Sequence, residues 1–362
     1  MDDFLNEHEV STKSTRCKNC GGEMKYDIES TDLKCERCGS TFDFDEGASV
    51  QRRAMTQDIM KNHAQWTEGA VFRCSSCGAK TVLDRKVMSK CCAFCGSAHI
   101  MSTEELPGVK PDSVIPFHIT KETARQRFTK WLKSKWFAPR SVKKMEKDEQ
   151  FNQLYSSSWS FSSNTFTSYQ GVLGRTETRT RTVNGRTQTY TTTRYFRVNG
   201  DIQKNYRDYF VQSGDRISAN TFNKLKPFNL SFIKAYRQEY LAGIVAEHYS
   251  RNIEVCFNDF ASFIKRDLRN QVMRRHHADV IQSLTLNTNY TDKAFNYVLL
   301  PIYIANYTFK KKLYNFYVNG VNGKVVGKYP KSIFKILFTV FMIAGVIGGA
   351  CLLMYILGGE PG

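Results

Sequence analysis

The stretches CKNCGGEMKYDIESTDLKCERCG (residues 17–39) and CSSCGAKTVLDRKVMSKCCAFCG (residues 74–96) decide the fold of the amino-terminal part of this chain. Each stretch holds two C-x-x-C pairs separated by fourteen residues, and the second repeats the first at an offset of 57 residues. Four thiolates in two such pairs are typical of a tetrahedral structural zinc site. We therefore predict two tandem, β-rich zinc ribbons, one over 13–46 and one over 70–103.

The predicted ligands are the eight cysteines of these pairs, and each tetrad would hold one Zn²⁺. They are Cys17, Cys20, Cys35, Cys38, Cys74, Cys77, Cys92 and Cys95. Cys91 is an alternative to Cys92, but only Cys92 keeps both the two-residue spacing and the match to the first ribbon. Four thiolates leave no open coordination position, so both metals are expected to build structure and not to catalyse.

Glycine follows every pair, which is a second regularity of the repeat: Gly21, Gly39, Gly78 and Gly96. A tight turn at positive φ is needed there, because backbone amides fold back toward the sulfur atoms. A disulfide framework is the rival interpretation of the cysteines. Eleven is an odd number, no stretch with the pattern of a secretory signal precedes the pairs, and C-x-x-C spacing suits zinc in a reducing compartment better.

The stretch ILFTVFMIAGVIGGACLLMYIL (residues 336–357) carries no charge. As a helix it would be about 33 Å long, enough to cross a hydrocarbon core of ~30 Å. Lysines precede it and only an uncharged or acidic segment follows, so the positive-inside rule places the amino-terminal body in the cytoplasm. We expect a single-pass, tail-anchored protein, with the juxtamembrane segment and transmembrane helix over 331–358 and a short outer tail over 359–362. Gly345 and Gly349 form a G-x-x-x-G step that would let two such helices make contact, in a homo- or hetero-oligomer.

Charge indicates the kind of surface that the chain contacts. The formal net charge is +18, and no acidic residue occurs between Ala294 and the apolar stretch. The predicted membrane-surface patch consists of Lys310, Lys311, Lys312, Lys324, Lys328, Lys331 and Lys335. Nucleic acid would attract the same lysines, but an anchor holds them at the bilayer, which favours anionic lipid.

The region between the ribbons and the anchor predicts an α+β cytoplasmic domain over 104–330, preceded by a flexible start over 1–12 and a linker over 47–69. Helices are expected over 120–136, 230–249 and 257–281, and strands over 297–307 and 313–329. In the third helix Phe260, Ile264, Leu268 and Val272 recur at helical spacing, which indicates a buried stripe. The first helix has a basic face, but its aromatic stripe favours packing in a core over contact with a membrane.

The run RTETRTRTVNGRTQTYTTTRYF (175–196) predicts a β-hairpin, because Asn184-Gly185 stands between two alternating stretches. This turn would place threonines opposite each other on one face: Thr182/Thr187, Thr180/Thr189, Thr178/Thr191 and Thr176/Thr193. Neither face is apolar, so we expect the hairpin to project from its domain. Its arginines would contact phosphate or anionic lipid, or would simply discourage edge pairing.

Motifs of catalysis are missing from the sequence. No G-x-x-x-x-G-K-[ST], G-x-S-x-G or H-E-x-x-H pattern occurs, and Cys256 lies in an apolar run that suits a buried small side chain. We therefore expect a protein that is not an enzyme.

The ribbons, the segment LKPFNLSFIKAYRQEYLAGIVAEHYSR (225–251) and the segment VLLPIYIANYTFKKKLYNFYVNGVNGKVVGKYP (298–330) resemble a bacterial family. This family is that of the transcription-factor-IIB-type zinc-ribbon membrane proteins, which are sometimes labelled primosomal-helicase-like. Some relatives look like membrane anchors of phage-shock-type envelope-stress systems. The resemblance implies little catalysis, a bacterial cell membrane location and recruitment of a cytosolic protein to the inner face of that membrane.

Two functions follow as hypotheses. The first is a non-enzymatic, tail-anchored scaffold whose ribbons bind cytosolic protein partners, with an envelope-stress response as the setting that the resemblance implies. The alternative is a membrane-tethered regulator that binds DNA or RNA through ribbon residues Lys18, Lys34, Arg37 and Arg73. Acidic residues outnumber these basic residues in the first ribbon, which favours a protein partner: Glu23, Asp27, Glu29, Asp32, Glu36, Asp43, Asp45 and Glu46.

Overall fold

The computed structural model describes residues 16–30, 32–42, 50, 52–56, 69–84, 92, 94–95, 100–104, 110–144, 150–183, 186–242, 244–310 and 312–357. Strands dominate these residues and helices are few. Within the described ranges, a 3-stranded sheet (β1-β2-β3) stands apart from a 12-stranded sheet that holds the other strands.

The strands are β1 (Met24–Tyr26), β2 (Leu33–Cys35), β3 (Thr41–Phe42), β4 (Arg53–Ala54), β5 (Gly69–Cys74), β6 (Lys80–Asp84), β7 (Ile100–Glu104), β8 (Ser113–Val114), β9 (Gln150–Val183), β10 (Arg186–Gln212), β11 (Lys234–Ala235), β12 (Val245–Glu247), β13 (Val280–Phe309), β14 (Lys312–Asn319) and β15 (Val325–Gly327). The helices are α2 (Lys121–Lys133), α3 (Arg140–Lys144), α4 (Ala219–Leu225), α5 (Ile253–Arg275) and α6 (Ile333–Leu357), with short 3-10 helices η1 (Leu230–Phe232) and η2 (Gln238–Leu241).

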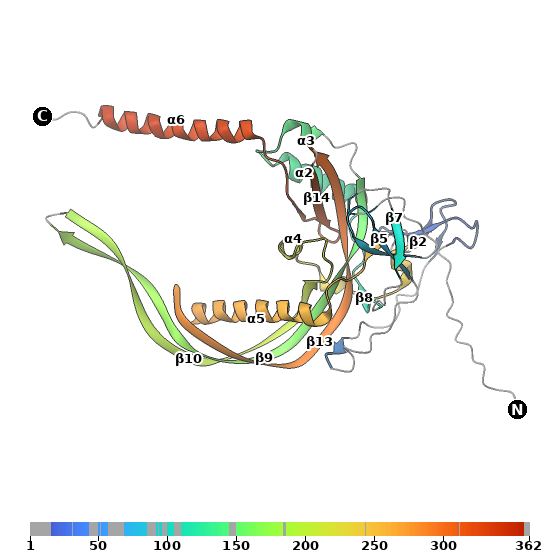
Figure 1. Ribbon diagram of the computed structural model, residues 1–362, viewed down its shortest axis with the longest axis horizontal. Helices are drawn as coiled ribbons and strands as arrows, with labels where there is room; N and C mark the ends of the chain where they lie inside the picture. The colour runs from blue at the N-terminus through green and yellow to red at the C-terminus, as the bar shows by residue number, and fades with distance from the viewer. Residues whose placement is uncertain are drawn as a thin grey trace.

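Three very long antiparallel strands form a curved arm, in which β9 lies between β10 and β13 (Figure 1). Pairing of β13 with β9 extends to Gly174, and beyond it β9 and β10 continue as a two-stranded ribbon. The threonine pairs predicted for the hairpin are confirmed, from Thr182/Thr187 to Thr176/Thr193. Asn184 and Gly185 lie outside the described residues. The hairpin is far longer than the sequence indicated, because both strands run on into the core.

Helix α5 lies along the concave face of the arm (Figure 1). The predicted stripe of Phe260, Ile264, Leu268 and Val272 is fully buried, which confirms the predicted core face of this helix. Each such side chain contributes about 1.5–3 kcal/mol when it leaves water. The helix starts earlier than expected and ends at Arg275, because the chain turns there to enter β13.

The arm widens into the body of the molecule at its other end. There β14 and β15 extend the sheet beyond β13, and β8 inserts between β13 and β11. Helix α2 begins at Thr120, whose hydroxyl accepts a hydrogen bond from the amide of Thr123. Its buried Phe128 packs against Phe316, with ring centroids 4.9 Å apart, so the aromatic stripe of this helix does belong to the core.

The two four-cysteine regions contact the body in different ways. Strands β5, β6 and β7 join the large sheet through the pairing of β6 with β12, which in turn pairs with β9. The small sheet of β1, β2 and β3 instead packs by side chains, with Tyr26 against Tyr240 at 5.4 Å between ring centroids.

The helix predicted over 230–249 is wrong. This segment forms η1, β11, η2 and β12, and its strands pair with β8 on one side of the body and with β9 and β6 on the other. Pairing with two distant parts of the sheet overrides the local helical pattern, and β-branched residues such as Ile244 and Val245 suit the extended backbone.

Two other expectations need correction. The strand predicted over 313–329 is divided into β14 and β15 by a turn, in which Gly323 has a φ of +73°. The linker predicted over 47–69, expected to be helical or irregular, contains a short strand, since Arg53 and Ala54 form β4 and pair with β13; residues 57–68 lie outside the described part.

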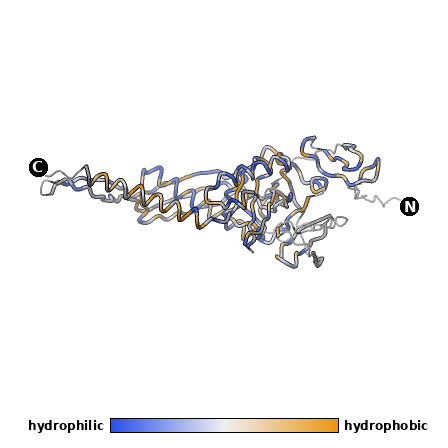
Figure 2. Tube along the Cα trace, turned by 90° about the horizontal axis from the view of Figure 1, so that it is seen from above, coloured by the Kyte–Doolittle hydropathy of each residue, from blue (hydrophilic) through white to orange (hydrophobic). Residues whose placement is uncertain are grey.

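Helix α6 extends from the body on the same side as the arm, and the first four-cysteine region lies at the opposite end of the molecule (Figures 1 and 2). Among the described residues, α6 is the one helix long and apolar enough to cross a membrane, over Ile333–Cys351, and no part of that span is buried.

Candidate metal centres and membrane helix

The first candidate metal centre is built from two tight turns of the small sheet. Cys17 and Cys20 flank one turn, and Cys35 ends β2 just before the second turn, which holds Cys38. The four sulfur atoms lie within 4.8 Å of one another, with Cys17 to Cys38 and Cys20 to Cys35 each at 3.5 Å. The sequence therefore predicted correctly which cysteines gather here.

Glycines make these turns possible. Gly21 and Gly39 have φ values of +68° and +74°, and their amides donate to the carbonyl oxygens of Cys17 and Cys35. Only glycine adopts this backbone without strain. At Gly22 a Cβ atom would lie 3.0 Å from the sulfur of Cys35, so the backbone here closes directly over the thiols.

The second centre has the same construction at the end of β5. The sulfur atoms of Cys74 and Cys95 are 3.8 Å apart, those of Cys77 and Cys92 are 3.7 Å apart, and all four lie within 4.8 Å of one another. Gly78 repeats the positive φ, at +71°. Cys92 thus belongs to this group of four sulfur atoms, while Cys91 and Gly96 lie outside the described residues.

Both sets of sulfur atoms fit a single tetrahedral metal ion. With metal–sulfur bonds of about 2.3 Å, a tetrahedron separates its sulfur atoms by about 3.8 Å, close to the spacing of both groups. Sulfur ligands in a tetrahedron favour zinc among the common metals. The Ser40 hydroxyl lies 3.2 Å from the Cys38 sulfur and lowers the pKa of that thiol.

The surroundings of the two centres differ. Cys74, Ala79, Cys92 and Phe94 are buried in the same cluster as Phe210 of β10, which fixes the second centre to the body. The first centre presents a more exposed outer surface, on which Glu23, Glu29 and Glu36 alternate with basic residues. Lys25 pairs with Glu36 there. Arg73 lies beside the second centre and not with Lys18, Lys34 and Arg37, so the predicted basic residues are divided between two surfaces.

The start of α6 is tied to the connection between α2 and α3. The Ser332 amide donates to the carbonyl oxygen of Phe137 at 2.8 Å. The ammonium group of Lys335 donates to the carbonyl oxygens of Trp136 and Ala138, at 2.9 and 2.8 Å. Trp136 itself is 62% exposed beside this joint, as expected for an aromatic residue near a membrane interface.

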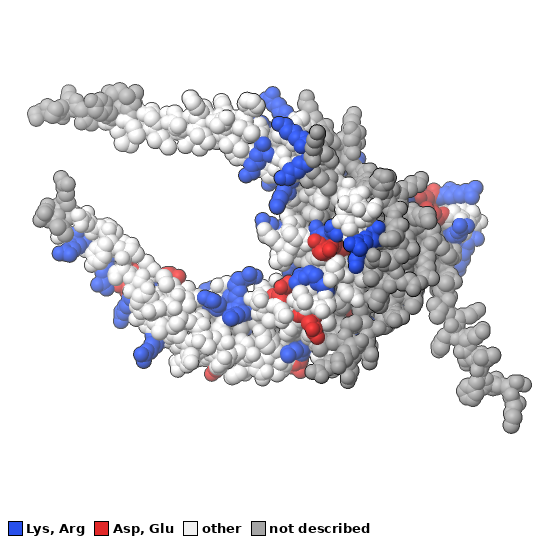
Figure 3. Space-filling view, in the orientation of Figure 1, with Lys and Arg blue, Asp and Glu red and all other residues white. Residues whose placement is uncertain are grey.

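The predicted lysine patch has two parts in the structure. Lys328 and Lys331 are exposed close to the start of α6, and Lys324 reaches back to the carbonyl oxygen of Lys226. Lys310 and Lys312 are exposed at the β13–β14 turn, and Lys311 lies outside the described residues. Figure 3 shows basic side chains at the base of α6 and along the arm, where several lie on its outer edge. In α6, a Cβ atom added at Gly345 or Gly349 would meet nothing within 4 Å, so this face is open.

The sheet contains a buried polar cluster that the sequence did not predict. Glu247 of β12 is 1% exposed and accepts hydrogen bonds from the Ser156 hydroxyl at 2.8 Å and the Gln212 amide at 3.1 Å. Burial raises the pKa of this carboxyl to about 7. A Cβ atom at Gly214 would lie 2.0 Å from the carboxylate, which explains the glycine. A lone glutamate in a short apolar strand gives no periodic signal that could have revealed this cluster.

Cys256 does not belong to either centre. It is fully buried on α5, and burial raises the pKa of its thiol to about 12, so it stays protonated at neutral pH. A protonated, inaccessible thiol is a poor nucleophile. The expectation of a buried small side chain is confirmed.

Comparison with known proteins gives one point of reference. The chain is 27% identical over 249 residues to a Bacillus subtilis (strain 168) protein described as "Uncharacterized protein YdjG", and the match covers 67% of this chain and 69% of that protein. No family model matches the chain. No solved structure matches it.

Proposed function

We propose that this chain is a non-enzymatic membrane scaffold that holds a cytosolic protein partner at the inner face of a bacterial membrane. Two structural zinc ions would fold the four-cysteine regions as zinc ribbons, and α6 would be the anchor. The observation that carries the proposal is the separation of these parts. Two closed four-sulfur centres lie at one end of the molecule, and an unburied apolar helix leaves from the other (Figure 1).

Zinc would supply folding free energy and no reactive group. A ribbon of this size buries too little surface to fold alone, and a structural zinc site contributes about 10–16 kcal/mol of apparent binding free energy. With four sulfur ligands the ion has no position for water or substrate, so the chemistry of the centres supports a role in binding surfaces.

The first ribbon is the better docking surface of the two. Both ribbons pack against the body, the first through Met24, Tyr26 and Leu33 and the second through Cys74, Cys92 and Phe94, but the first leaves Glu23, Glu29 and Glu36 exposed. Acidic side chains repel nucleic acid and attract basic patches of a protein. The resemblance to phage-shock-type anchors supports the same role, with an envelope-stress protein as the partner.

Orientation follows from the lysines. Lys328, Lys331 and Lys335 cluster at the start of α6 and would meet anionic headgroups, each contributing about 1 kcal/mol near the surface. This arrangement supports an orientation with the ribbons, the body and the arm in the cytoplasm. The open face at Gly345 and Gly349 would allow two anchors to associate.

The alternative function, a membrane-tethered binder of DNA or RNA, draws on the exposed Lys18, Lys34 and Arg37 of the first ribbon. It requires binding that falls steeply with salt and is lost when these three residues are reversed in charge.

A crosslinked pull-down from membranes tests the proposal. The intact chain is compared with a Cys17→Ser/Cys20→Ser variant and with a Cys256→Ser control that changes a cysteine outside both centres. We expect the first variant to remain in the membrane and to lose a defined protein partner, while the control keeps it. Loss of bound nucleic acid in place of protein would favour the alternative, and retention of the partner would contradict the scaffold proposal.

A further inference from the structure

The outer edge of the arm is unusual in its length. Strand β10 pairs with β9 along its length apart from a bulge between Tyr206 and Tyr209, and no other strand in the described ranges pairs with its second edge. At about 3.3 Å per residue, this edge spans roughly 90 Å. An unpaired edge of a sheet offers a row of amide and carbonyl groups to any extended chain.

At Asp201 a hydrogen bond shows which way the backbone carbonyl group of β10 points. The Arg275 guanidinium donates to the carbonyl oxygen of Asp201 at 2.9 Å from the side opposite β9. In an antiparallel pair, the amide and carbonyl of one residue point to the same side, and alternate residues point to opposite sides. The backbone groups of Asn199, Gln203 and Asn205 therefore also point to the open edge.

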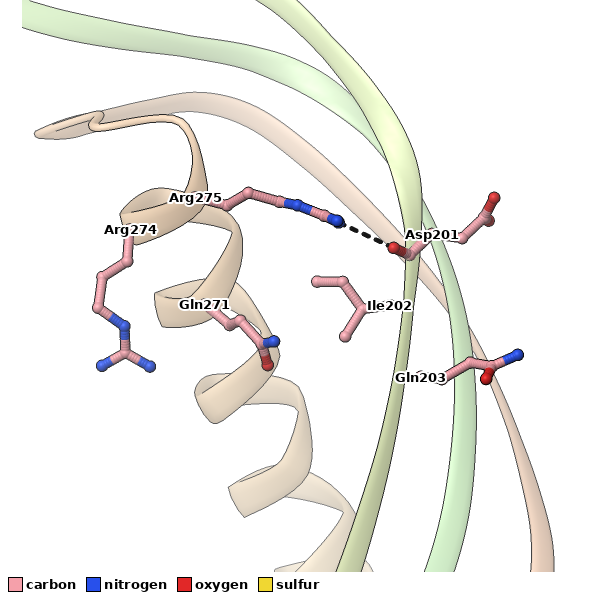
Figure 4. Close-up of a pocket in the computed structure, with 6 residues that line it drawn as sticks. All are labelled: Asp201, Ile202, Gln203, Gln271, Arg274 and Arg275. Atoms are coloured by element: carbon pink, nitrogen blue, oxygen red, sulfur yellow. Dashed lines mark hydrogen bonds between the residues drawn. The ribbon is translucent and has the colours of Figure 1, made fainter.

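A groove accompanies this part of the edge. It has a volume of about 460 Å³ and lies between β10 and the last turns of α5 (Figure 4). Asp201, Ile202 and Gln203 line it from the strand, and Gln271, Arg274 and Arg275 line it from the helix. Gln271 and Ile202 point toward one another in this view, and Arg275 reaches across to the strand. The groove is thus bounded by a strand edge on one side and by cations on the other.

One polar atom in the groove is left without a partner. The side-chain oxygen of Gln271 is buried and accepts no hydrogen bond from the described residues. Because a buried acceptor without a donor costs about 1–3 kcal/mol, an amide that enters the groove would be favoured there.

Charge decides the kind of chain that fits. Along β10, Arg194, Arg197 and Arg207 are exposed, and the facing side of α5 adds Arg274 and Arg275. Two nearby acidic residues are engaged within the molecule, since Asp267 pairs with Lys204 and Asp208 pairs with Arg52. The carboxylate of the exposed Asp201 points away from α5 (Figure 4), and the arginines outnumber it. Pairing of β10 with a second copy of itself would place arginines near arginines, which opposes self-association. An acidic strand would meet complementary charge.

We propose that the open edge of β10 at Gln203 and Asn205, next to the Asp201 carbonyl that Arg275 already occupies, is, together with Arg274 and Arg275 of α5, a docking site for an extended acidic segment of another protein. The segment would add a strand to the arm, and its carboxylates would pair with the two arginines. This site is separate from the zinc ribbons, so the proposal does not depend on partner binding by them.

The test uses full-length protein in detergent micelles and a synthetic ten-residue peptide that alternates threonine and glutamate. Gln203→Pro removes one amide of the open edge and leaves the β9 ladder intact, and Gln203→Ala is its matched control. Arg274→Glu reverses a charge in the groove, and Arg269→Glu makes the same change on an exposed position of α5 outside the groove.

We expect Gln203→Pro and Arg274→Glu to raise the Kd of the peptide at least tenfold, and both controls to leave it within twofold. A peptide that is N-methylated at alternate residues should also bind at least tenfold more weakly. Equal binding of the methylated peptide, equal effects of Arg274→Glu and Arg269→Glu, or no binding at about 1 mM peptide would overturn the proposal. A dimer that Gln203→Pro converts to monomer would overturn it in favour of a second copy of this chain.

Discussion

The Ser156 hydroxyl of β9 donates to the carboxylate of Glu247 in β12 at 2.8 Å, in a site closed to solvent where the arm meets the strands of the second four-cysteine region. Desolvation favours the neutral carboxylic acid at this position and raises its pKa to about 7. The folded protein therefore binds a proton that the unfolded chain releases near its ordinary pKa of 4.5.

This difference predicts that stability falls as the pH rises. Between the pKa of Glu247 in the unfolded chain and its pKa in the folded protein, the native state holds more protons than the unfolded state. The contribution of Glu247 to the free energy of unfolding is therefore present at low pH and is lost toward pH 8. Glu247→Gln cannot ionise. We expect the free energy of unfolding of this variant, relative to the parent, to increase by roughly 2 to 3 kcal/mol from pH 5 to pH 8. Denaturant titrations of both proteins at the two pH values measure this; a pH-independent difference would refute it.

Metal content distinguishes two centres from one. We expect about two zinc ions per intact chain, one in Cys35→Ser, one in Cys74→Ser and two in the control Cys256→Ser, because each centre needs all four thiolates. Elemental mass spectrometry of purified protein gives the ratio. Two ions retained in Cys35→Ser would show that its tetrad is not the ligand set.

The direction in which α6 leaves the body leads to a prediction for the protein in a bilayer. The arm and α6 extend from the same side of the body, but the exposed threonines and arginines of the hairpin cannot enter hydrocarbon without a large cost (Figure 1). We infer that, in a bilayer, α6 turns away from the arm at Pro330–Ser332 and releases the hydrogen bonds of Ser332 and Lys335.

In membranes a membrane-impermeant maleimide should therefore label Thr189→Cys at the exposed hairpin from the cytoplasmic side, and should leave the native Cys351 of α6 unlabelled until detergent is added. Protection of the hairpin position by the bilayer would contradict the proposed turn.

The packing of α5 against the strands of the arm should contribute most of the stability of the arm. Leu268 is fully buried against the strands, so Leu268→Ala should lower the free energy of unfolding by about 2–5 kcal/mol. Lys265→Ala, on the exposed side of the same helix, should change it by no more than about 0.5 kcal/mol. Similar losses in both variants would mean that α5 does not pack as described.

Local patterns predicted what depends on local chemistry. The spacing of Cys17, Cys20, Cys35 and Cys38 identified a sulfur cluster, and the threonine alternation around Asn184-Gly185 predicted the correct pairing register. The stripe of α5 followed from its period in the same way. In each case the residues that interact are close in sequence or repeat at a fixed interval.

The pairing of strands that lie far apart in the sequence could not be predicted from the sequence. Residues 150–174 contain many serines and aromatic residues, and nothing local shows that they continue the hairpin strand into the core between β10 and β13. The segment 230–249 has a helical period, yet its strands are fixed by distant partners. The buried position of Glu247 could be recognised only in the structure, where those partners enclose it.

Recruitment of the partner to the membrane can be measured in cells. Once the pull-down has identified the partner, its fraction at the membrane is measured by fluorescence microscopy in cells with the intact chain, with Cys17→Ser/Cys20→Ser, and with a chain that ends before α6. We expect the partner to be recruited to the membrane with the intact chain and with neither altered chain. A partner that stays at the membrane with either altered chain would contradict a scaffold that joins a metal-built docking module to a membrane anchor.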